Sequence, residues 1–218
     1  MGVNWIQSGD GSPTLFSPAF GEAYHNQNGA RGQAERLFVG RSGILELKEA
    51  RVLEVGFGLG LNFFAARRVL CDRGGRLFYL AYEPHPVPVS VLEAFVLACT
   101  LAEPWLVEAW EAADGYVYED HCGVLEVRFF PFERGRVPEG WADAVFFDPF
   151  SPRANPEAWS KANLRRAFVA LRPGGVLVSY AVAGWVRRAL AEVGFEVEKL
   201  PGELGKKAWL RARRPGSA

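Results

Sequence analysis

Strand-like and helix-like segments alternate along the chain from residue 46 onward. The strand-like segments, which are rich in apolar and β-branched residues, span 50–56, 76–83, 124–130, 142–148 and 176–182. Segments with the helical spacing of apolar residues alternate with them, at 61–71, 87–101, 155–171 and 184–195. This alternation predicts right-handed βαβ units and a mostly parallel sheet, and therefore an α/β fold.

In the last third of the chain, turn residues predict where helices begin and end. Asn155, followed by Pro156, is expected to begin the helix at 155–171, and the Arg-Pro-Gly-Gly stretch at 172–175 to end it. Gly194 is expected to end the last helix. Near the C-terminus, FEVEKL and KKAWLRAR flank PGELG, which predicts a hairpin that adds an antiparallel strand to the sheet.

The first 45 residues differ from the rest, because Gly, Ser, Asn and Gln are frequent there and aromatic residues are interspersed. We expect an N-terminal extension over 1–45 and one main domain over 46–218. The N-terminus lacks the basic start and apolar run of a signal peptide. No apolar run reaches the roughly 18 residues of a membrane span. The expectation is therefore a cytoplasmic protein without membrane contact.

Cysteine and histidine are sparse. Cys71, Cys99 and Cys122 are odd in number and show no CxxC or metal-ligand spacing, so we expect buried or inert thiols in a reducing cytoplasm. The three histidines are scattered along the chain. This argues against a His-based metal site and against a Ser/His/Asp triad, and no metal is expected.

Charge is unevenly distributed although the net charge is +0. From Lys161 to the end there are 12 Lys and Arg against 4 Asp and Glu, whereas residues 1–160 hold 13 against 21. A net charge of zero argues against a uniformly basic nucleic-acid binder. The asymmetry indicates either a basic face for a polyanion or the solvated faces of helices and a charged tail.

A glycine-rich turn follows the first strand of the main domain. It reads Glu54-Val-Gly56-Phe-Gly58-Leu-Gly60, and Leu61 stands where a dinucleotide fingerprint needs its third glycine. The glycines allow backbone to approach a ligand closely, and the next helix would point its N-terminal amides at that ligand. The alternative is a turn that only lets a helix pack on a strand.

An acid ends the second strand of the main domain. Glu83 lies 23 residues after Gly60 and precedes Pro84. In open α/β sheets ligands bind at the carboxyl ends of the strands, where such a carboxylate can accept hydrogen bonds from both ribose hydroxyls of an adenosine. The alternative is an exposed acid in a loop.

A second acid ends the strand at 142–148, in the sequence ADAVFFDPFSPRANPEAW. Asp148 follows four apolar residues and precedes Pro149, which disfavours a helical conformation for Asp148. A charge at the edge of a core is costly unless it is paired or used. Asp148 is therefore either a group that handles a proton or an acid that caps a loop.

Several of these motifs resemble known families. The pattern EVGFGLGLNF, the acid Glu83 and the stretch LRPGGVLVSYAV resemble Rossmann-like class I S-adenosylmethionine-dependent methyltransferases. The segments SPTLFSPAFGEAY, DPFSPRANPEAW and AGWVRRALAEVGFEV resemble, in order, the methyltransferase half of the bifunctional MnmC family. The resemblance covers nearly the whole chain, and the last two of these segments are quite specific.

The resemblance implies a fold, a cofactor and a catalytic acid. The fold would be the class I fold, and Asp148 would be the catalytic acid. S-adenosylmethionine would be bound by Glu54, Gly56, Phe57, Gly58, Gly60, Asn62, Glu83, Phe130 and Asp148. Two departures from the family pattern stand out. Pro149 replaces a glycine, and no acid lies in residues 128–132, which leaves adenine recognition to Phe130, Phe132 or backbone.

The resemblance also implies a substrate. The family methylates the primary amine of 5-aminomethyl-2-thiouridine at the tRNA wobble position, giving 5-methylaminomethyl-2-thiouridine. Candidate substrate contacts are, for the base, Phe20, Tyr24, Glu35, Phe150 and Trp159 and, for phosphate, Arg187, Arg188, Lys206 and Lys207. For the aromatic residues a place in the core is the alternative, and for the basic residues a solvated face.

The chain ends at Ala218, so a stand-alone methyltransferase without the FAD-dependent oxidase domain of the bifunctional relatives is expected. Another enzyme would then have to supply the aminomethyl group. Two other interpretations stay open. One is another amino-directed S-adenosylmethionine-dependent methyltransferase, acting on a small amine, a protein amide or a nucleobase. The other is a non-catalytic binding module with the same fold.

Overall fold

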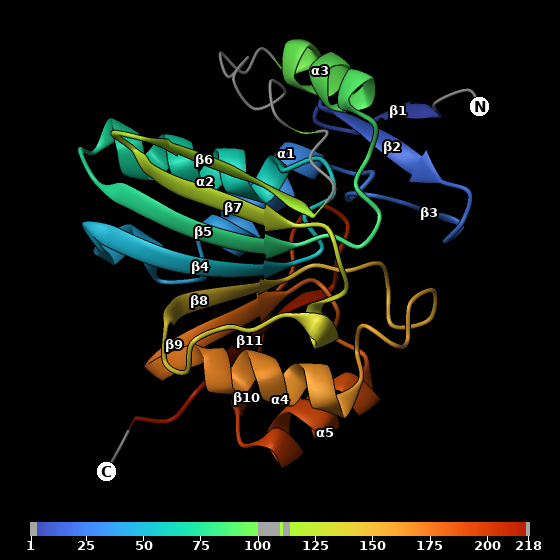
Figure 1. Cartoon of the computed structure of the whole chain (residues 1–218). Helices are drawn as coiled ribbons and strands as arrows, with labels where there is room; N and C mark the ends of the chain where they lie inside the picture. The colour runs from blue at the N-terminus through green and yellow to red at the C-terminus, as the bar shows by residue number, and fades with distance from the viewer. Residues whose placement is uncertain (1–3, 100–109, 111–113, 217–218) are drawn as a thin grey trace.

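The computed structural model describes residues 4–99, 110 and 114–216. Among these residues, eight strands form one large sheet in the order β10-β11-β9-β8-β4-β5-β7-β6 (Figure 1). The strands are β4 (Glu49–Val55), β5 (Arg76–Tyr82), β6 (Gly115–Asp120), β7 (Gly123–Arg128), β8 (Ala142–Phe147), β9 (Leu171–Ser179), β10 (Glu196–Pro201) and β11 (Ala208–Arg213).

The centre of the sheet is parallel and its edges are antiparallel. Strand β4 pairs in parallel with both β5 and β8, β5 with β7, and β8 with β9. The C-terminal hairpin joins through β11, which is antiparallel to β9 and to β10. This confirms the predicted α/β fold with its C-terminal hairpin. Strand β6, antiparallel to β7 at the opposite edge, was not predicted.

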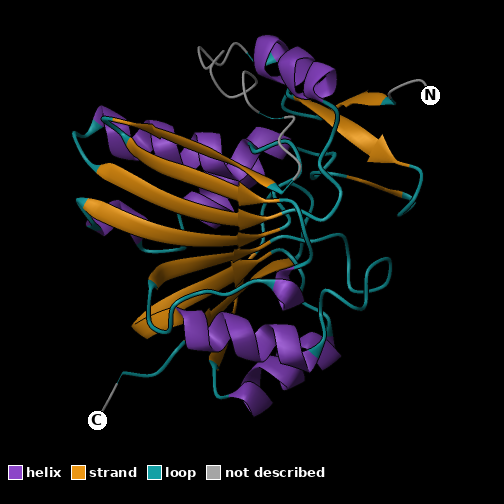
Figure 2. Cartoon of the chain, viewed as in Figure 1, coloured by secondary structure: helices purple, strands orange, loops and turns teal. Residues whose placement is uncertain are grey.

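Helical segments cover both faces of the sheet (Figure 2). The helical segments of the described residues are α1 (Ala30–Gln33), the π-helical η1 (Ala34–Val39), η2 (Ile44–Glu46), α2 (Leu61–Asp72), α3 (Val89–Ala98), η4 (Phe132–Arg134), α4 (Lys161–Ala170) and α5 (Gly184–Val193). The last two expected residues of the helix at 87–101 lie outside the described residues. Among those described, none of the helices is long and apolar enough to cross a lipid bilayer.

Successive residues of the parallel strands serve two separate cores. Val52 and Phe146 pack with α2 and η1 on one face, whereas Leu53 and Phe147 pack with α4 and α5 on the other. Strands buried on both faces need apolar residues at nearly every position, which explains the unbroken apolar runs in the sequence.

The N-terminal segment forms a small antiparallel sheet of β1 (Trp5–Gln7), β2 (Pro13–Ser17) and β3 (Glu22–Ala23). In Figure 1 it lies beyond the carboxyl ends of the parallel strands. Leu15 belongs to the same apolar cluster as Val52 of the large sheet. The N-terminal segment is thus held at the edge where a parallel sheet binds ligands.

The prediction that a helix begins at Asn155 was wrong. Helix α4 begins at Lys161, and the Ser160 hydroxyl caps it by accepting a hydrogen bond from the Asn163 amide at 3.3 Å. Asn155 accepts a bond from the Ala158 amide at 3.4 Å, so its capping potential is used in a separate preceding turn. Ser160 is extended, with φ −56° and ψ 148°, and it separates this turn from the helix.

The Arg-Pro-Gly-Gly stretch is not the turn that was predicted, because it lies within β9. Helix α4 ends at Ala170 as expected, and β9 begins at once at Leu171, which pairs with Ala142. The pairing of β8 with β9 shifts register between Ala142 and Ala144, and the Arg-Pro-Gly-Gly stretch lies opposite this shift. Strand β9 ends at Ser179, three residues before the predicted end, so Tyr180 leaves the sheet at its carboxyl edge.

The prediction of three unpaired cysteines was also wrong. Cys71 and Cys122 form a disulfide across 51 residues of sequence, with Cα atoms 5.3 Å apart. Cys99 is buried and is not part of this bond. The pairing follows from topology, because the β6–β7 turn lies beside the end of α2, a proximity that the spacing of cysteines along the chain does not reveal.

Candidate functional site

The candidate site is a cavity at the carboxyl ends of the parallel strands. Its volume is about 370 Å³, within the usual range for small-molecule pockets. The wall combines the glycine turn after β4, the acid after β5, the loop at 131–133 and the acid after β8. The lining residues include Tyr24, Gly56, Phe57, Gly58, Asn62, Glu83, His85, Pro131, Phe132, Asp148, Pro149 and Phe150.

A hydrogen-bond network lies behind this cavity. The Asn62 side-chain amide donates to Glu54 Oε1 at 2.8 Å and to Asp148 Oδ2 at 2.7 Å. The Tyr79 hydroxyl donates to the other Glu54 oxygen at 2.8 Å. Glu54 is fully buried and does not line the cavity, so it reaches the site through Asn62.

Burial changes the acidity of the site. It raises the pKa of Asp148 to about 8, an effect that the Asn62 hydrogen bond opposes. Burial also raises the pKa of Glu83 and holds that of Glu54 well above its usual range. Three carboxyl groups that are costly to ionise favour a cationic ligand, because a positive charge stabilises their ionised forms.

Hydrogen bonds from backbone amides hold the Glu83 carboxylate in place. Its two carboxylate oxygens accept hydrogen bonds of 2.9 Å from the amides of Gly58 and His85. A carboxylate has about four acceptor positions, so acceptor capacity remains for a ligand. Glu83 therefore links the glycine turn to the loop after β5 and presents acceptors to the cavity.

The glycine turn approaches the loop after β8 very closely. Gly56 has φ +88°, and a Cβ atom there would lie 2.8 Å from the Asp148 carbonyl oxygen. Gly58 has φ +56°, and a Cβ atom would meet the Tyr24 ring at 3.1 Å. Both positions favour glycine for conformation, and Gly56 also requires it for space, because the neighbouring atom is backbone.

A second cavity, of about 430 Å³, meets the first at Asp148. The two share the residues Tyr24, His25, Asp148, Pro149 and Phe150. The second cavity is also lined by Glu22, Tyr180 and Lys206. Asp148 therefore lies in a wall that faces both cavities.

Tyr180 and Glu22 order the second cavity. The Tyr180 hydroxyl donates to the Pro149 carbonyl at 2.8 Å, and Lys206 Nζ lies 5.7 Å from the centre of the Tyr180 ring. Glu22 accepts bonds from the Ser151 hydroxyl and amide, at 2.5 and 3.0 Å. The loop after β8 is thus held on one side by β9 and on the other by the N-terminal sheet.

The aromatic candidates fall into two groups. Phe20 and Phe150 stack with ring centres 4.2 Å apart, and both line the first cavity together with Tyr24. Trp159 is instead 1% exposed, packs edge-on against Phe147 and donates to the Phe150 carbonyl at 2.9 Å. Trp159 is therefore a core residue, which was the alternative to a contact with the base. It supports the loop that carries Phe150.

Other predicted site residues lie behind or outside the cavities. Gly60 precedes α2 in a left-handed conformation. Phe130 packs against Tyr82 with ring centres 5.7 Å apart, and Phe132 rather than Phe130 lines the first cavity. Glu35 pairs with Arg68 at 2.6 Å on the protein surface and lines neither cavity.

The basic candidates differ in their relation to the cavities. Lys206 and Lys207 line a smaller hollow of about 260 Å³, together with Pro152, Tyr180 and Ala183. Arg187 and Arg188 lie on α5, and the Arg187 guanidinium donates to the Val182 carbonyl at 3.3 Å. Among these four residues, Lys206 also lines the second cavity.

Sequence reasoning missed Tyr180, Glu22 and Ser151. Tyr180 follows a strand at the carboxyl edge, which is the signal that identified Glu83 and Asp148, but the predicted strand ended three residues too late. Glu22 and Ser151 are 129 residues apart in the sequence. No local pattern marks such a pair.

The chain is similar in sequence to known methyltransferases. A family described as S-adenosyl-L-methionine-dependent methyltransferase matches residues 117–215. The tRNA 5-methylaminomethyl-2-thiouridine biosynthesis bifunctional protein MnmC of Aromatoleum aromaticum is 37% identical over 94% of this chain and 34% of its own length. MnmC of Azoarcus sp. is 34% identical over 95% of this chain and 35% of its own length. The chain spans about a third of the length of these curated relatives.

A solved structure extends the similarity to three dimensions. The crystal structure of MNMC2 from Aquifex aeolicus superposes with a TM-score of 0.78 and 29% identity, over 100% of this chain and 72% of that one. The fold and the cavity at its carboxyl edge define a class I S-adenosylmethionine-dependent methyltransferase. Within that class, the chain is similar over nearly its whole length to about a third of the MnmC proteins and to MNMC2.

The chemistry of the first cavity fits the cofactor of this class. S-adenosylmethionine carries a sulfonium and an ammonium, and the cavity offers the carboxyl groups of Asp148 and Glu83. Its adenosine part has two ribose hydroxyls, which can donate to a carboxylate such as Glu83. The aromatic and proline residues of the loop at 131–133 supply an apolar wall for a flat base.

Proposed function

We propose that this protein methylates the primary amine of 5-aminomethyl-2-thiouridine, or of its unthiolated form, at the tRNA wobble position. The observation that carries the proposal is the position of Asp148 in the wall between two cavities. The relatives named for 5-methylaminomethyl-2-thiouridine biosynthesis support the choice of substrate.

The first cavity is the proposed cofactor site. When bound, S-adenosylmethionine supplies an electrophilic methyl group on a sulfonium sulfur. Glu83 accepts hydrogen bonds from the ribose hydroxyls, and the Gly56–Gly58 turn lets backbone approach the cofactor. Phe132, in place of the predicted Phe130, contacts the adenine. Glu54 acts indirectly, because its side chain bonds Asn62, which in turn bonds Asp148.

Asp148 is the proposed catalytic residue. An alkyl amine has a pKa of roughly 10.4 by analogy with lysine, so at neutral pH most of it is protonated and cannot attack a methyl group. A carboxylate within hydrogen-bond reach can accept the proton and orient the nitrogen lone pair. The raised pKa of Asp148, about 8, makes it a better base than an ordinary aspartate.

The second cavity is the proposed site of the modified uridine. Tyr24, Phe150 and Tyr180 offer aromatic surfaces for a base that has left its stack, and Lys206 offers a cation for its phosphate. Arg187, Arg188 and Lys207 extend the basic surface beyond the cavity. The division into an N-terminal substrate-side extension and a methyltransferase domain rests on Glu22 and Tyr24, which come from the extension.

The proposed reaction needs a primary aminomethyl group on the uridine. A preceding reaction must therefore install this amine on the tRNA, and we place both steps in the cytoplasm. The test is to incubate the protein and S-adenosylmethionine with tRNA that carries 5-aminomethyl-2-thiouridine, and to analyse the nucleosides by mass spectrometry. The expected product is one methyl group heavier, on the amine. Unchanged wobble nucleoside, with methylation of a free amine or a peptide instead, would refute the proposal.

A further inference from the structure

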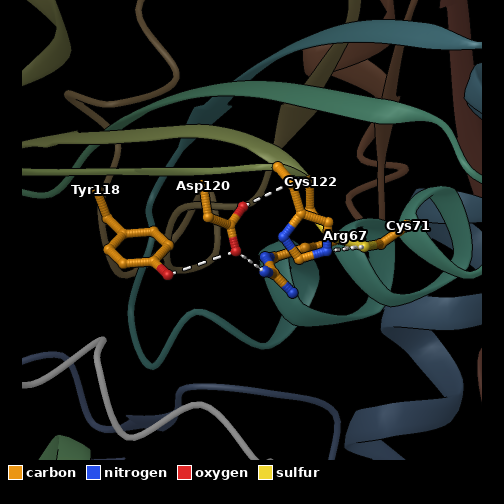
Figure 3. The surroundings of a disulfide bond; sticks show 6 residues. Arg67, Cys71, Tyr118, Asp120 and Cys122 are labelled. Atoms are coloured by element: carbon orange, nitrogen blue, oxygen red, sulfur yellow. Dashed lines mark hydrogen bonds and ion pairs between the residues drawn. A yellow bond between two sulfur atoms is a disulfide. The ribbon is translucent and has the colours of Figure 1, made fainter.

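A cluster of three potential metal ligands lies away from both cavities. Cys71 is in the last turn of α2, and Cys122 is in the turn between β6 and β7 (Figure 3). His121 is the other residue of this turn. Because β7 is parallel to β5, this turn is at the amino end of β7, opposite the edge that carries Asp148. The cluster therefore belongs to neither proposed substrate site.

The three ligand atoms are close together. All lie within 4.8 Å of one another, and His121 Nε2 lies 3.3 Å from Cys122 Sγ and 3.9 Å from Cys71 Sγ. A tetrahedral Zn²⁺ site with the usual Zn–S and Zn–N bonds places nitrogen and sulfur about 3.6 Å apart. The two observed distances lie on either side of this value.

We propose that Cys71, His121 and Cys122 bind a divalent metal ion of the Zn²⁺ type when the Cys71–Cys122 disulfide is reduced. Thiolate and imidazole ligands are those that Zn²⁺ prefers, and the fourth position is open to water. Two thiolates also neutralise the charge of the ion. His121 is exposed and Cys71 is half-buried, so an ion has access from solvent.

The change between the two states balances in a simple way. A dithiol reductant gives two electrons and two protons to the disulfide and becomes a disulfide itself. The ion then binds the two sulfurs, and the two thiol protons pass to solvent. About 3.8 Å separates two sulfurs on a tetrahedral Zn²⁺, so the cysteine side chains must move apart after reduction.

The surroundings hold the ligand-bearing turn in place. Asp120 Oδ1 accepts a bond from the Cys122 amide at 2.8 Å, and Asp120 Oδ2 is ion-paired with Arg67 of α2. The Tyr118 hydroxyl lies 3.4 Å from the same Asp120 oxygen (Figure 3). These contacts join the turn to α2 independently of the disulfide, so the ligands remain near one another when it is reduced.

The test is metal titration of the whole protein before and after reduction. Co²⁺ reports thiolate ligands through a thiolate-to-metal charge-transfer absorption, and Zn²⁺ should displace it. We expect one ion per reduced chain and none per oxidised chain. His121→Ala and Cys71→Ser should each weaken binding at least about 10- to 100-fold, because even residues that only support metal ligands have effects of that size.

Cys99→Ser is the matched control, since Cys99 is a cysteine outside the cluster, and its metal affinity should equal that of the wild type. His121 is exposed, so His121→Ala should fold normally. Absence of a stoichiometric ion in the reduced protein would overturn the site, as would equal affinity in His121→Ala. Three titratable thiols in the denatured, unreduced protein, instead of the one expected, would overturn its control by the disulfide.

Discussion

The Asn62 side-chain amide nitrogen lies 2.7 Å from Asp148 Oδ2 and 2.8 Å from Glu54 Oε1, so a single amide nitrogen donates to two acids. Asn62 is in the first turn of α2, directly after the glycine turn. The start of this helix therefore sets the position of the strand-end acid on a neighbouring strand. The relationship also makes the acidity of Asp148 depend on Asn62.

We expect Asn62→Ala to change how cofactor affinity depends on pH. The pKa of Asp148 is raised to about 8, so its ionised form, which attracts a cation, is populated only as the pH rises through that value. Affinity for S-adenosylmethionine should therefore increase between about pH 6 and 9 in the wild type. Removing the Asn62 bond removes an interaction that favours ionisation, so the increase should move to higher pH. Calorimetric titration over this range measures the effect.

Asn155→Ala is the control for that experiment, because Asn155 lines the same cavity without a hydrogen bond to Asp148 or Glu54. Its pH profile should match the wild type. Glu83 also has a raised pKa and contributes in the same direction, so some pH dependence should remain in Asp148→Asn. A profile in Asn62→Ala that coincides with the wild type would show that this amide does not control the acid.

Asp148→Ala should leave the fold intact and, at saturating S-adenosylmethionine, lower kcat by about 10² or more, the usual scale for a general acid or base. Asp148→Asn separates two roles. If proton transfer dominates, Asn should be nearly as slow as Ala, and higher pH should partly rescue both by supplying neutral amine. If orientation dominates, Asn should keep much of the rate at every pH. A wild-type rate in Asp148→Ala would leave Asp148 as a structural residue.

Glu83→Ala should weaken S-adenosylmethionine binding at least about tenfold. It removes two charge-assisted hydrogen bonds to the ribose, each worth about 1.5–3 kcal/mol. It also leaves the amides of Gly58 and His85 without their acceptor, so a thermal melt must accompany the calorimetry. Glu133→Ala, an exposed acid in the wall of the same cavity, is the matched control. Equal affinity in both variants would place the ribose elsewhere.

Binding of tRNA should weaken as salt rises, because phosphate contacts release counterions. Reversing the charges of Lys206 and Lys207 together should flatten this dependence and leave S-adenosylmethionine affinity unchanged. Reversing Arg187 and Arg188 tests the neighbouring helix in the same way. Reversal of Lys161, whose ammonium pairs with Glu192 at 2.8 Å on the surface, serves as the control. If neither pair alters the slope, tRNA docks on another face.

Reduction of the Cys71–Cys122 disulfide should lower stability. The bond closes a segment of 51 residues, for which chain entropy gives a contribution of about 4 kcal/mol. In a chain of this size each kcal/mol corresponds to about 2–4 °C in Tm. Unfolding of the wild type with and without reductant, in the presence of a chelator, measures the loss. The variant with both residues changed to Ser should show one Tm under both conditions.

Strand-end acids could be predicted because their signal is local. Glu83 and Asp148 each follow an apolar run and precede a proline, and such patterns need no knowledge of neighbouring strands. Asn62, next to the glycine turn, was recognised through the family resemblance. The helix at 184–195 was also placed correctly, since Gly194 adopts the left-handed conformation that ends it.

Other features depend on contacts between distant segments. Ser160 and Asn155 are both good helix caps in isolation. Ser160 caps α4 because Asn155 is used in an earlier turn. Tyr180 lies in the site because β9 ends before it. The end of β9 is determined by its pairing with β8. The pairing of Cys71 with Cys122 required the register of β6 and β7. None of these can be read from composition or periodicity.

The wall shared by the two cavities has a kinetic consequence. Since each cavity has its own lining residues besides the five in common, we expect either of the proposed substrates to bind while the other is absent. This corresponds to a random sequential mechanism, in which initial-rate plots intersect and no compulsory order exists. S-adenosylhomocysteine should then compete with S-adenosylmethionine and act as a mixed inhibitor towards tRNA. Turnover would be set by whichever product dissociates more slowly, without a requirement that one leave first.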